Sequence, residues 1–584
     1  MDYDYIIVGA GSAGCVLANR LTKDANHRVL LVEAGPKNKG LSLKIPAAIL
    51  KNLQSTKHNW AYQGEPEPGL GGRTITHDRG KTLGGSSSIN GLCFIRGHAL
   101  DFEGWRQAGC EGWGYADVLP YFKRIENYSG GGDEYRGGDG PLGVHRPAPQ
   151  NPIYKAFVDA GRDAGYPITD DICGYRQEGF GVFDMSIDKG ERNSTAKAYL
   201  EPVRSRQNLT VITDTQVQKI LFDGIEARGI SYHRGNDDIT KAYASKEVIL
   251  SAGAVGSPQL LMLSGVGPAS HLKEIGIPVI TDMPGVGQNL NDHPDFVLKF
   301  RCLQPVSIWP QTRFIGRNMA GIRWLLRRDG ICASNQFETV ACVRSAAGVE
   351  YPDIQLTVSP AAVDDQTWEP LQEHAFQIHV GLMRNFSRGS ISPAAVDDQT
   401  WEPLPEHAFQ IHVGLMRNFS RGSITLRDAN PATSPRILAN YLKDPRDRDL
   451  LRKGIRIVRE LADQPSFKPL CGEEIYPGTA VQSDNELDAC LEEKINTQWH
   501  LSGTARMGSS NNHEAVVDPQ GRVHGLSGLR IVDASIMPAA TNGNTNSPTI
   551  MIAEKLSDSI LGKTPLARIE VPVWQNKDYE TCQR

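Results

Sequence analysis

The sequence predicts an α/β fold built on a Rossmann-like dinucleotide-binding domain. An apolar strand at residues 5–8 runs into a Gly-x-Gly-x-x-Gly motif at residues 9–14, and an apolar helix follows at residues 16–21. A second apolar strand ends in Glu33, 19 residues beyond Gly14. This order of strand, glycine motif, helix and acidic strand end is the dinucleotide-binding fingerprint.

Each glycine of the first motif has a physical role. Gly9 permits the tight turn after the strand, Gly11 lets the backbone approach a pyrophosphate, and Gly14 allows helix and strand to pack closely. The phosphates then lie at the helix N-terminus, where N–H groups and the helix dipole favour anions. Glu33 suits ribose hydroxyls and argues against a 2′-phosphate. We therefore expect dinucleotide contacts at Gly9, Gly11, Ser12, Ala13, Gly14, Glu33 and Ala34.

Two further glycine clusters follow in the chain. Residues 80–91 combine glycines with serines, a threonine and an asparagine, which suits close passage beside a phosphate or a planar ring. A plain Gly/Ser loop is the structural alternative. Residues 253–267 form the third cluster, directly after an apolar strand at residues 247–250. From the second cluster we expect cofactor contacts at Thr82, Gly84, Gly85, Ser86, Asn90 and Gly91.

Together, the three clusters resemble the signatures of the glucose–methanol–choline (GMC) family of FAD-dependent oxidoreductases. The first is similar to the family's FAD fingerprint, and the other two are similar to its diagnostic patterns. Residues 284–294 add a further match, and the resemblance extends from Tyr3 to Lys563. It implies an FAD-binding domain and a substrate domain, the latter with an antiparallel sheet flanked by helices. The expected pieces are 1–155, 200–300 and 480–565 for FAD, 156–199 and 301–479 for substrate, and 566–584 as a peripheral tail.

The C-terminal part carries the residues that the resemblance implies to be catalytic. Residues 499–508 read Trp-His-Leu-Ser-Gly-Thr-Ala-Arg-Met-Gly, and the family's catalytic base matches His500. The partner of that base matches Asn546, while Asn544 also has a claim to the role. Both asparagines suit helix capping as well. The resemblance further implies FAD contacts at Val217, Asp533 and Asn544.

The implied reaction is oxidation of an alcohol, with a primary alcohol favoured, to an aldehyde or ketone. Neutral His500, with a pKa near the ordinary value of about 6.5, accepts the alcohol proton. His500 and Asn546 hold the alkoxide while hydride passes to flavin N5. Ile89 matches the position of the histidine that links FAD covalently in some family members, so we expect non-covalent FAD. No metal ion is expected.

The electron acceptor and the reaction class have alternatives. The overall sequence resembles bacterial choline-dehydrogenase-like and aliphatic alcohol dehydrogenases, which favours a quinone-like acceptor. The form of the histidine motif at residues 499–502 resembles aryl or furanic alcohol oxidases, which favours oxygen. A hydroxynitrile lyase that binds FAD without using its redox chemistry is an alternative of another class, and so is a catalytically inactive duplicate.

A tandem repeat is the main departure from the family pattern. Residues 359–391 are repeated at 392–424, with one difference, Gln372 against Pro405. Two near-identical copies exclude a solenoid, which needs three or more units. Each copy contains an alternating strand and an Asn-Phe-Ser-Arg-Gly turn, and residues 423–427 offer a hairpin partner to the second copy only. We therefore expect the strand of copy two to occupy the sheet, with about one repeat extruded as a surface loop.

Composition and charge exclude other classes of protein. The chain has 584 residues, 40% hydrophobic and 22% charged, which is ordinary for a globular protein. The net charge of −5 gives no sign of a nucleic-acid partner. The ten cysteines show no C-x-x-C or metal-type spacing, which favours reduced thiols in a cytoplasmic protein. No stretch reaches the roughly 18 apolar residues of a membrane span, and peripheral association with the inner face of a membrane stays open.

Overall fold

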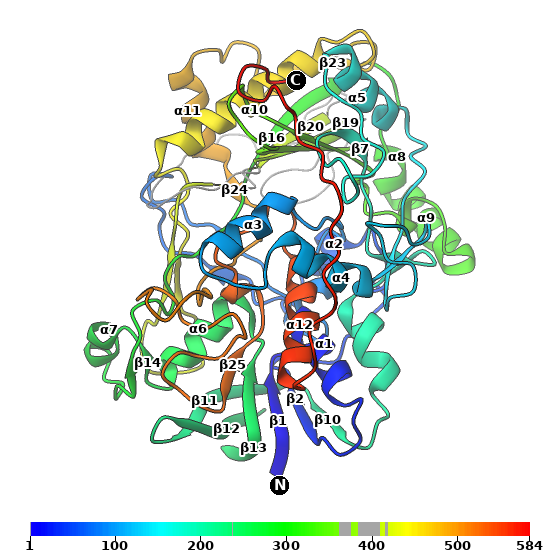
Figure 1. Ribbon diagram of the computed structural model, residues 1–584. Helices are drawn as coiled ribbons and strands as arrows, with labels where there is room; N and C mark the ends of the chain where they lie inside the picture. Colours follow the sequence, from blue (N-terminus) through cyan, green and yellow to red (C-terminus); the bar gives the residue numbers. More distant parts are fainter. Residues whose placement is uncertain (1, 236–237, 361–374, 383–408, 415–417) are drawn as a thin grey trace.

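The computed structural model describes residues 2–235, 238–360, 375–382, 409–414 and 418–584. Two large sheets lie at opposite ends of the molecule (Figure 1). One is mostly parallel at its centre and carries the N-terminal strand, and the other is mostly antiparallel. The predicted α/β fold with a second, antiparallel sheet is confirmed.

Parallel strands form the centre of the first sheet, which has the order β10-β2-β1-β13-β12-β11 with β25 beside β13. Ile6 of β1 pairs with Leu30 of β2 on one side and with Val248 of β13 on the other. β2 is apolar and buried along its whole length, as expected of a parallel strand covered on both faces. The strands are β1 (Asp2–Val8), β2 (Val29–Val32), β10 (Leu209–Ile212), β11 (Thr215–Asp223), β12 (Glu226–Arg234), β13 (Thr240–Leu250) and β25 (Leu529–Ile531).

Helices from distant parts of the chain pack around this sheet. α1 begins at the first glycine motif and packs against α12, which in turn packs against α4. Glu554 of α12 holds the group together, because it forms ion pairs with Arg20 of α1 and Arg124 of α4. These three helices are α1 (Ser12–Leu21), α4 (Tyr115–Ile125) and α12 (Asn546–Ile560). α6 (Gly253–Leu263) packs against β11, and the other helices of this part of the molecule are α2 (Ile49–Leu53), α3 (Ala99–Gln107) and α7 (Ala269–Glu274).

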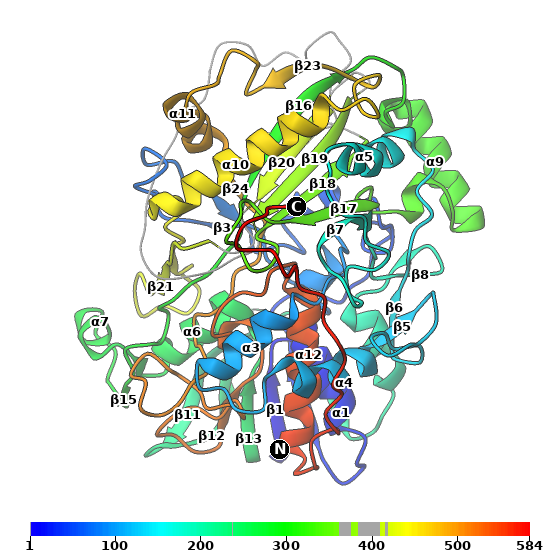
Figure 2. The same ribbon diagram turned by 45° about the horizontal axis from the view of Figure 1, so that its top comes forward.

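The second sheet has the order β23-β16-β19-β20-β18-β17-β7, with β24 also beside β16. α5 and α10 lie across one of its faces (Figure 2). Its strands are β7 (Gly179–Val182), β16 (Pro294–Cys302), β17 (Thr339–Val343), β18 (Ile354–Ser359), β19 (Ala375–Leu382), β20 (Phe409–Gly414), β23 (Cys471–Tyr476) and β24 (Asn496–Thr497). Because β16 and β24 belong to this sheet, parts of segments 200–300 and 480–565 pair with the second sheet rather than the first.

The remaining elements are short or lie at the periphery. Helices on the second half of the molecule are α5 (Pro152–Asp163), α8 (Trp309–Thr312), α9 (Phe314–Arg327), α10 (Pro445–Ala462) and α11 (Asp484–Lys494). Two-stranded pairs are β3 (Tyr62–Gln63) with β4 (Thr76–His77), β5 (Glu126–Tyr128) with β6 (Leu142–Val144), β8 (Ile187–Asp188) with β9 (Glu191–Arg192), β14 (Val266–Gly267) with β15 (Thr281–Asp282), and β21 (Ser423–Thr425) with β22 (Arg436–Leu438). Within the described ranges, no helix has the length and apolar character to cross a bilayer.

The strands of the two repeat copies take equivalent registers in the second sheet. Phe296 of β16 pairs with Val380 of β19 and also with Val413 of β20, and these two residues are 33 positions apart. β18 likewise pairs with both strands, and Ile378 pairs with Ile411 in parallel without offset. The other edge of β16 is taken by β23 and β24. Both copies therefore match one strand position between β16 and β18.

The expectation that copy two alone enters the sheet is thus wrong. The eight residues of β19 recur without change at residues 408–415, so neither copy has a hydrogen-bonding or side-chain advantage over the other. The loop expected to be extruded lies outside the described residues. The turn of copy one, at residues 385–389, also lies outside them.

The predicted hairpin after copy two is also wrong. β21 pairs with β22 and not with β20. Asp447 of α10 explains the change, because its carboxylate accepts hydrogen bonds from the backbone N–H groups of Phe419 (2.6 Å) and Ser420 (3.0 Å). These contacts hold the segment against α10 instead of letting it close a tight turn. Residues 566–584, expected as a peripheral tail, run along the surface from the end of α12 to the second sheet (Figure 1).

Candidate active site

A cavity of about 1200 Å³ lies between the two sheets. Its lining comes from the ends of β1 and β2, from the N-termini of α1 and α6, and from Gln355 and Thr357 of β18. The volume exceeds the roughly 300–1,000 Å³ of a typical small-molecule pocket, so a dinucleotide and a small substrate fit together. The predicted residues that line it are Gly9, Gly11, Ser12, Ala13, Glu33, Ala34, Gly85, Ser86, Asn90, Gly91, Val217, His500, Asp533, Asn544 and Asn546.

The first glycine motif turns the chain from β1 into α1 at the floor of this cavity. Gly9 has a φ of 99°, in the left-handed region, and a Cβ there would lie 2.5 Å from the Ser251 carbonyl oxygen. Gly11 is the N-cap of α1, so the open N–H groups of the first helical turn border the cavity. This geometry suits an anionic phosphate at the helix N-terminus.

Glu33 fixes this loop from the end of β2. Its Oε2 accepts a hydrogen bond from the Ala10 N–H (2.9 Å), and its Oε1 accepts one from the Gly35 N–H (2.8 Å). Burial raises the pKa of the Glu33 carboxyl to about 7. Each oxygen keeps a second lone pair, so the carboxylate can also accept ribose hydroxyls at the cavity wall.

The second glycine cluster packs directly against the first. A Cβ on Gly85 would lie 2.7 Å from the Cα of Gly11, so the two loops approach at backbone distance. Ser86 Oγ accepts a hydrogen bond from the Gly80 N–H (3.1 Å), which closes the loop. A substituent at Gly85 would push the two glycine loops apart where they form one wall.

Three of the predicted cofactor residues support this wall without lining the cavity. Thr82 donates its hydroxyl to the Pro36 carbonyl oxygen (2.8 Å), and Gly84 donates its N–H to the Ala10 carbonyl oxygen (2.7 Å). Gly14 packs α1 onto β1, since a Cβ there would lie 1.9 Å from the Gly9 carbonyl oxygen.

Asp533 joins β25 to the third glycine cluster. Its Oδ2 accepts hydrogen bonds from the Gly253 N–H (2.9 Å) and the Ser257 hydroxyl (2.6 Å) at the start of α6. Its Oδ1 accepts from the N–H and the hydroxyl of Ser535 (2.8 and 2.6 Å). The carboxylate therefore has four protein donors, and its main contribution is to hold the cavity-facing backbone.

His500 lies where groups from both halves of the chain meet. Its backbone N–H donates to Asp292 Oδ1 (2.7 Å). Its ring Nε2 lies 3.0 Å from Asn544 Nδ2, and its Nδ1 lies 2.9 Å from His293 Nδ1. An amide NH₂ can only donate, so Nε2 is the acceptor in this arrangement, and Nδ1 carries the proton and donates to His293.

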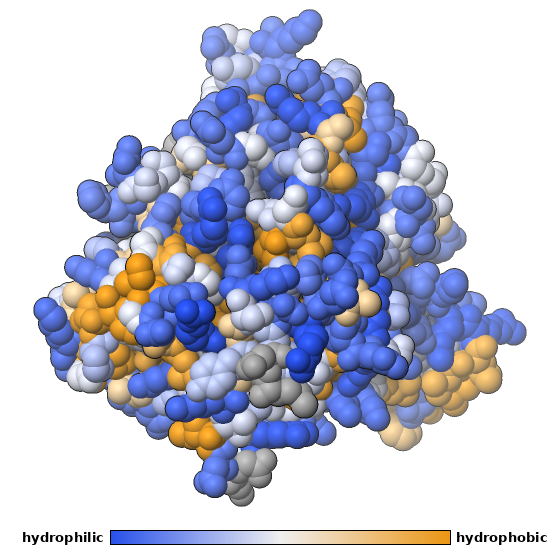
Figure 3. Space-filling model, turned by 60° about the horizontal axis from the view of Figure 1, so that its bottom comes forward, coloured by the Kyte–Doolittle hydropathy of each residue, from blue (hydrophilic) through white to orange (hydrophobic). Residues whose placement is uncertain are grey.

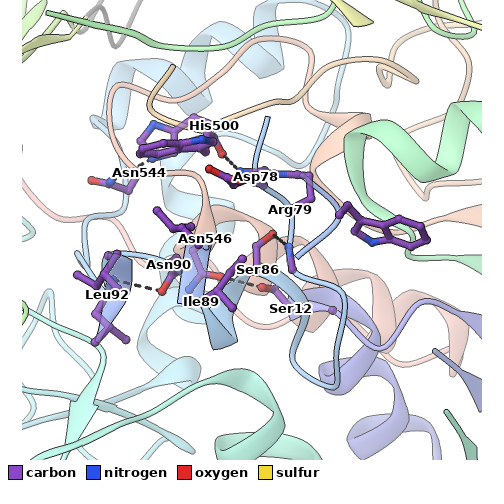
Figure 4. Close-up of a pocket in the computed structure, with 18 of the residues that line it drawn as sticks. Ser12, Asp78, Arg79, Ser86, Ile89, Asn90, Leu92, His500, Asn544 and Asn546 are labelled. Carbon is purple, nitrogen blue, oxygen red and sulfur yellow. Dashed lines mark hydrogen bonds between the residues drawn. The ribbon is translucent and has the colours of Figure 1, made fainter. Parts of the chain in front are cut away.

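The structure brings Asn544, rather than Asn546, to the imidazole (Figure 4). Asn546 is the first residue of α12, and its Oδ1 accepts a hydrogen bond from the Ser12 hydroxyl (2.7 Å) at the start of α1. The expected pair of His500 and Asn546 is not formed, because the start of α12 aims this amide at α1. Both asparagines still line the same cavity.

Burial dominates the electrostatics of His500. It lowers the pKa of the imidazole to about 3, with a further contribution from the positive charge of Arg79. The expectation of a pKa near 6.5 is therefore wrong, because the residue is only 8% exposed and burial disfavours the charged imidazolium. The ring is neutral at physiological pH, so it is ready to accept a proton.

Three neighbours of His500 were missed in the sequence. Asp292 and His293 lie just before Pro294 at the end of the 284–294 segment, so an Asp-His pair within a family-like motif was the available signal. Arg79, which donates to the Trp499 carbonyl oxygen, precedes the second glycine cluster and gave no local signal. Trp499 itself has a φ of 59°, in the left-handed region, so the residue before the imidazole is held in a strained backbone conformation.

The residues present fit a flavin dinucleotide. Besides the paired glycine loops and Glu33, the cavity has buried polar atoms without a partner within the described part of the chain, among them Ser251 Oγ, Gln355 Nε2, Gln498 Oε1 and Asn544 Oδ1. Such atoms need a hydrogen-bonding partner from a ligand or water. Among the described residues, no group of three His, Cys, Asp or Glu side chains is placed to hold a metal ion.

Comparison with known proteins gives full-length matches. Residues 3–295 and 418–553 match the GMC oxidoreductase family. The oxygen-dependent choline dehydrogenase of Brucella ovis is 43% identical over all of both chains. That of Pseudomonas aeruginosa is 46% identical over 97% of this chain and 96% of its own length. The mitochondrial choline dehydrogenase of Mus musculus is 44% identical over 99% of this chain and 93% of its own length.

Solved structures of the same fold agree with this. Pyridoxine 4-oxidase from Mesorbium loti superposes with a TM-score of 0.82 at 30% identity, covering 96% of this chain and all of that one. Formate oxidase from Aspergillus oryzae superposes with a TM-score of 0.85 at 25% identity, covering 96% of this chain and 98% of that one. The chain belongs to the GMC oxidoreductase family and is an FAD-dependent oxidoreductase that acts on the CH–OH group of an alcohol.

Proposed function

We propose that this chain oxidises a primary alcohol to an aldehyde, with His500 as the proton acceptor. The observation that carries this role is the neutral, buried imidazole whose Nε2 faces the cavity shared with the glycine loops. FAD supplies the hydride acceptor when it is bound. Gly11, Ser12, Glu33, Gly85 and Ser86 would hold it.

Asn544 is the proposed partner of His500. Its Nδ2 donates to His500 Nε2, at 3.0 Å, and both side chains line the cavity. An alcohol hydroxyl that enters between the two side chains replaces this contact: it donates its proton to Nε2 and accepts a hydrogen bond from Asn544 Nδ2, so the developing alkoxide is held by both side chains. The Nδ1–H of His500, donated to His293, keeps the acceptor nitrogen facing the substrate.

A matched pair of variants distinguishes the roles of the two asparagines. Asn544→Ala removes a donor to the reacting oxygen, so the rate of FAD reduction should fall about 100-fold. Asn546→Ala removes only the contact to Ser12, so it should change FAD affinity more than the rate. Anaerobic stopped-flow reduction of the FAD-loaded variants measures the rate of FAD reduction in each. The opposite ranking would return the partner role to Asn546.

Non-covalent attachment of FAD is supported by the side chains at the second glycine cluster. Ile89 lines the cavity, is 2% exposed and has no nucleophile. Cys93 also lines the cavity, but burial raises the pKa of its thiol to about 12, so it stays a thiol. Acid precipitation should leave the yellow colour in the supernatant. A yellow pellet would contradict this attachment.

Choline is the leading substrate candidate, since relatives 43–46% identical carry that name. Aromatic rings line the cavity, among them Trp60, Tyr62 and Trp499, and aromatic faces bind quaternary ammonium groups. Anaerobic bleaching of FAD by choline, compared with its neutral isostere 3,3-dimethylbutan-1-ol, tests this. Equal rates would remove the ammonium from recognition. Bleaching by any alcohol excludes the lyase and the inactive duplicate.

A quinone is the proposed electron acceptor, and oxygen is the second candidate. The bacterial relatives are named oxygen-dependent, which favours oxygen. The wide cavity, bordered by α8 and α9 as well as by the glycine loops, has room for a second planar reactant, which favours a quinone. Reoxidation of the reduced enzyme by air or by a water-soluble quinone, followed at the same concentration, ranks the two.

A further inference from the structure

Exposed apolar side chains gather on α9. Of the thirteen large hydrophobic residues that are exposed among the described residues, six lie on this one helix. Monomeric proteins rarely expose large contiguous apolar patches without a partner. In the space-filling view the patch lies at the right edge of the molecule, at the position of α9 (Figure 3). The six are Phe314, Ile315, Met319, Ile322, Leu325 and Leu326.

The helix presents this apolar face away from the protein. At about 100° per residue, Met319, Ile322 and Leu326 lie within roughly 60° of one another. Trp324, about 160° away from Leu326 by the same count, is the buried residue of the helix and donates its ring N–H to the Gly190 carbonyl oxygen (2.6 Å). α9 is therefore anchored by one side and offers the other to its surroundings.

The charges around this face are positive. Residues 302–328 contain five arginines and no Asp or Glu, in a chain whose net charge is −5. Arg323 is paired with Asp329, and Arg328 with Glu191. Arg327 forms no close ion pair within the described residues, although the charge of Asp329 is near it, and it is exposed beside the apolar stripe. An apolar helix face flanked by arginines is complementary to the interface of an anionic bilayer.

The same helix borders the active-site cavity. Arg313, Phe314, Arg317, Ala320 and Gly321 line it, in continuity with the residues around His500. A surface on which α9 docks would therefore lie at the cavity entrance. A reactant dissolved in that surface would reach the cavity without crossing water.

We propose that α9 is a membrane-docking helix, whose apolar stripe enters the interface of an anionic bilayer and sets the cavity entrance against the lipid. Delivery of a lipid-dissolved quinone by this route rests on the proposed function; docking itself does not. The proposed occupant is a lipid surface, whose apolar interior matches the stripe and whose negative headgroups match the arginines. A second copy of the chain is the competing occupant.

Co-sedimentation of the FAD-loaded protein with vesicles tests docking. The vesicles are phosphatidylcholine alone or a 3:1 mixture with phosphatidylglycerol. The wild type should bind the anionic vesicles, and the triple variant Met319→Glu, Ile322→Glu, Leu326→Glu should bind at least about tenfold less tightly. Arg327→Gln should weaken binding about fivefold on the anionic vesicles only. Ile225→Glu, at a 58% exposed apolar residue in the turn between β11 and β12, is the control and should bind as the wild type does.

Turnover distinguishes docking from catalysis. With a water-soluble dye as acceptor, the triple variant should match the wild type, while with ubiquinone in anionic vesicles its rate should fall in proportion to binding. No binding by the wild type, or equal binding by the triple variant, would overturn the proposal. A dimer that dissociates in the triple variant would overturn it too, by showing that α9 is covered by a second copy. Failure of every alcohol to bleach FAD would defeat the proposed function and leave the vesicle result unaffected.

Discussion

The two sheets of this molecule differ in how tightly the sequence assigns each strand to its place. In the first sheet, β1 has a different partner on each edge, and the glycine loops beyond it meet at backbone distance. In the second sheet, two identical strands, β19 and β20, match one position between β16 and β18. The glycine loops beside the first sheet leave no room for a Cβ at their contact, whereas the second sheet carries a whole spare strand. Adding a single methyl group beside the first sheet should therefore lower stability, whereas deleting 33 residues from the second sheet should change stability little.

The largest effect is expected where the two halves meet. His500→Ala removes the proposed proton acceptor, so the rate of FAD reduction by alcohol should fall about 10²- to 10⁴-fold. FAD should stay bound, since the glycine loops are unchanged, and its absorbance spectrum is the control. Reduction at a rate close to the wild type would show that another group accepts the proton.

Gly14→Ala tests the close packing of α1 on β1 by adding one methyl group. The new Cβ would lie 1.9 Å from the Gly9 carbonyl oxygen, so α1 must move off β1. We expect a loss of about 1–3 kcal/mol in the free energy of unfolding, together with weaker FAD binding. The matched control is Gly104→Ala in α3, where a Cβ meets no atom within 4 Å. That variant should be unchanged or stabilised by about 0.5–1 kcal/mol. Equal denaturation curves for both variants would refute the close packing.

The pH dependence of stability tests the burial of His500. Its folded pKa, about 3, is lower than the ordinary unfolded value of about 6.5. The unfolded chain thus binds the proton first, so this contribution to stability is complete above pH 6.5 and is lost as the pH falls toward 3. The slope should be on the order of 1 kcal/mol per pH unit, and His500→Asn should remove it. Thermal unfolding of both proteins between pH 7 and pH 5 measures the difference, and parallel curves would mean that the imidazole is not buried.

Local chain order allowed the first half of the site to be predicted. A strand, three glycines and an acidic residue lie within the first 33 positions, and their spacing alone defines the dinucleotide loop. The contact between His293 and His500 spans 207 positions and depends on how β16 and the 499–508 segment meet. The choice between Asn544 and Asn546 depends on where α12 begins, because one residue turns a helical side chain by about 100°. The pairing of β21 was set by Asp447, a side chain outside the strand pattern.

The smallest effect on stability and activity is expected from the largest change in the chain, the deletion of one repeat copy. Deleting residues 359–391 leaves the strand of copy two, which pairs with β16 and β18 in the same register as the removed strand. The free energy of unfolding should change by no more than about 1 kcal/mol, because the entropy cost of closing a loop depends only weakly on its length. FAD reduction by alcohol should continue. Deleting both copies, residues 359–424, is the contrasting variant, because β16 and β18 then lose the strand between them and their backbone groups lose their partners. If the single deletion unfolded the protein as the double deletion does, the two copies would not be equivalent, and the second sheet would be as exacting as the first.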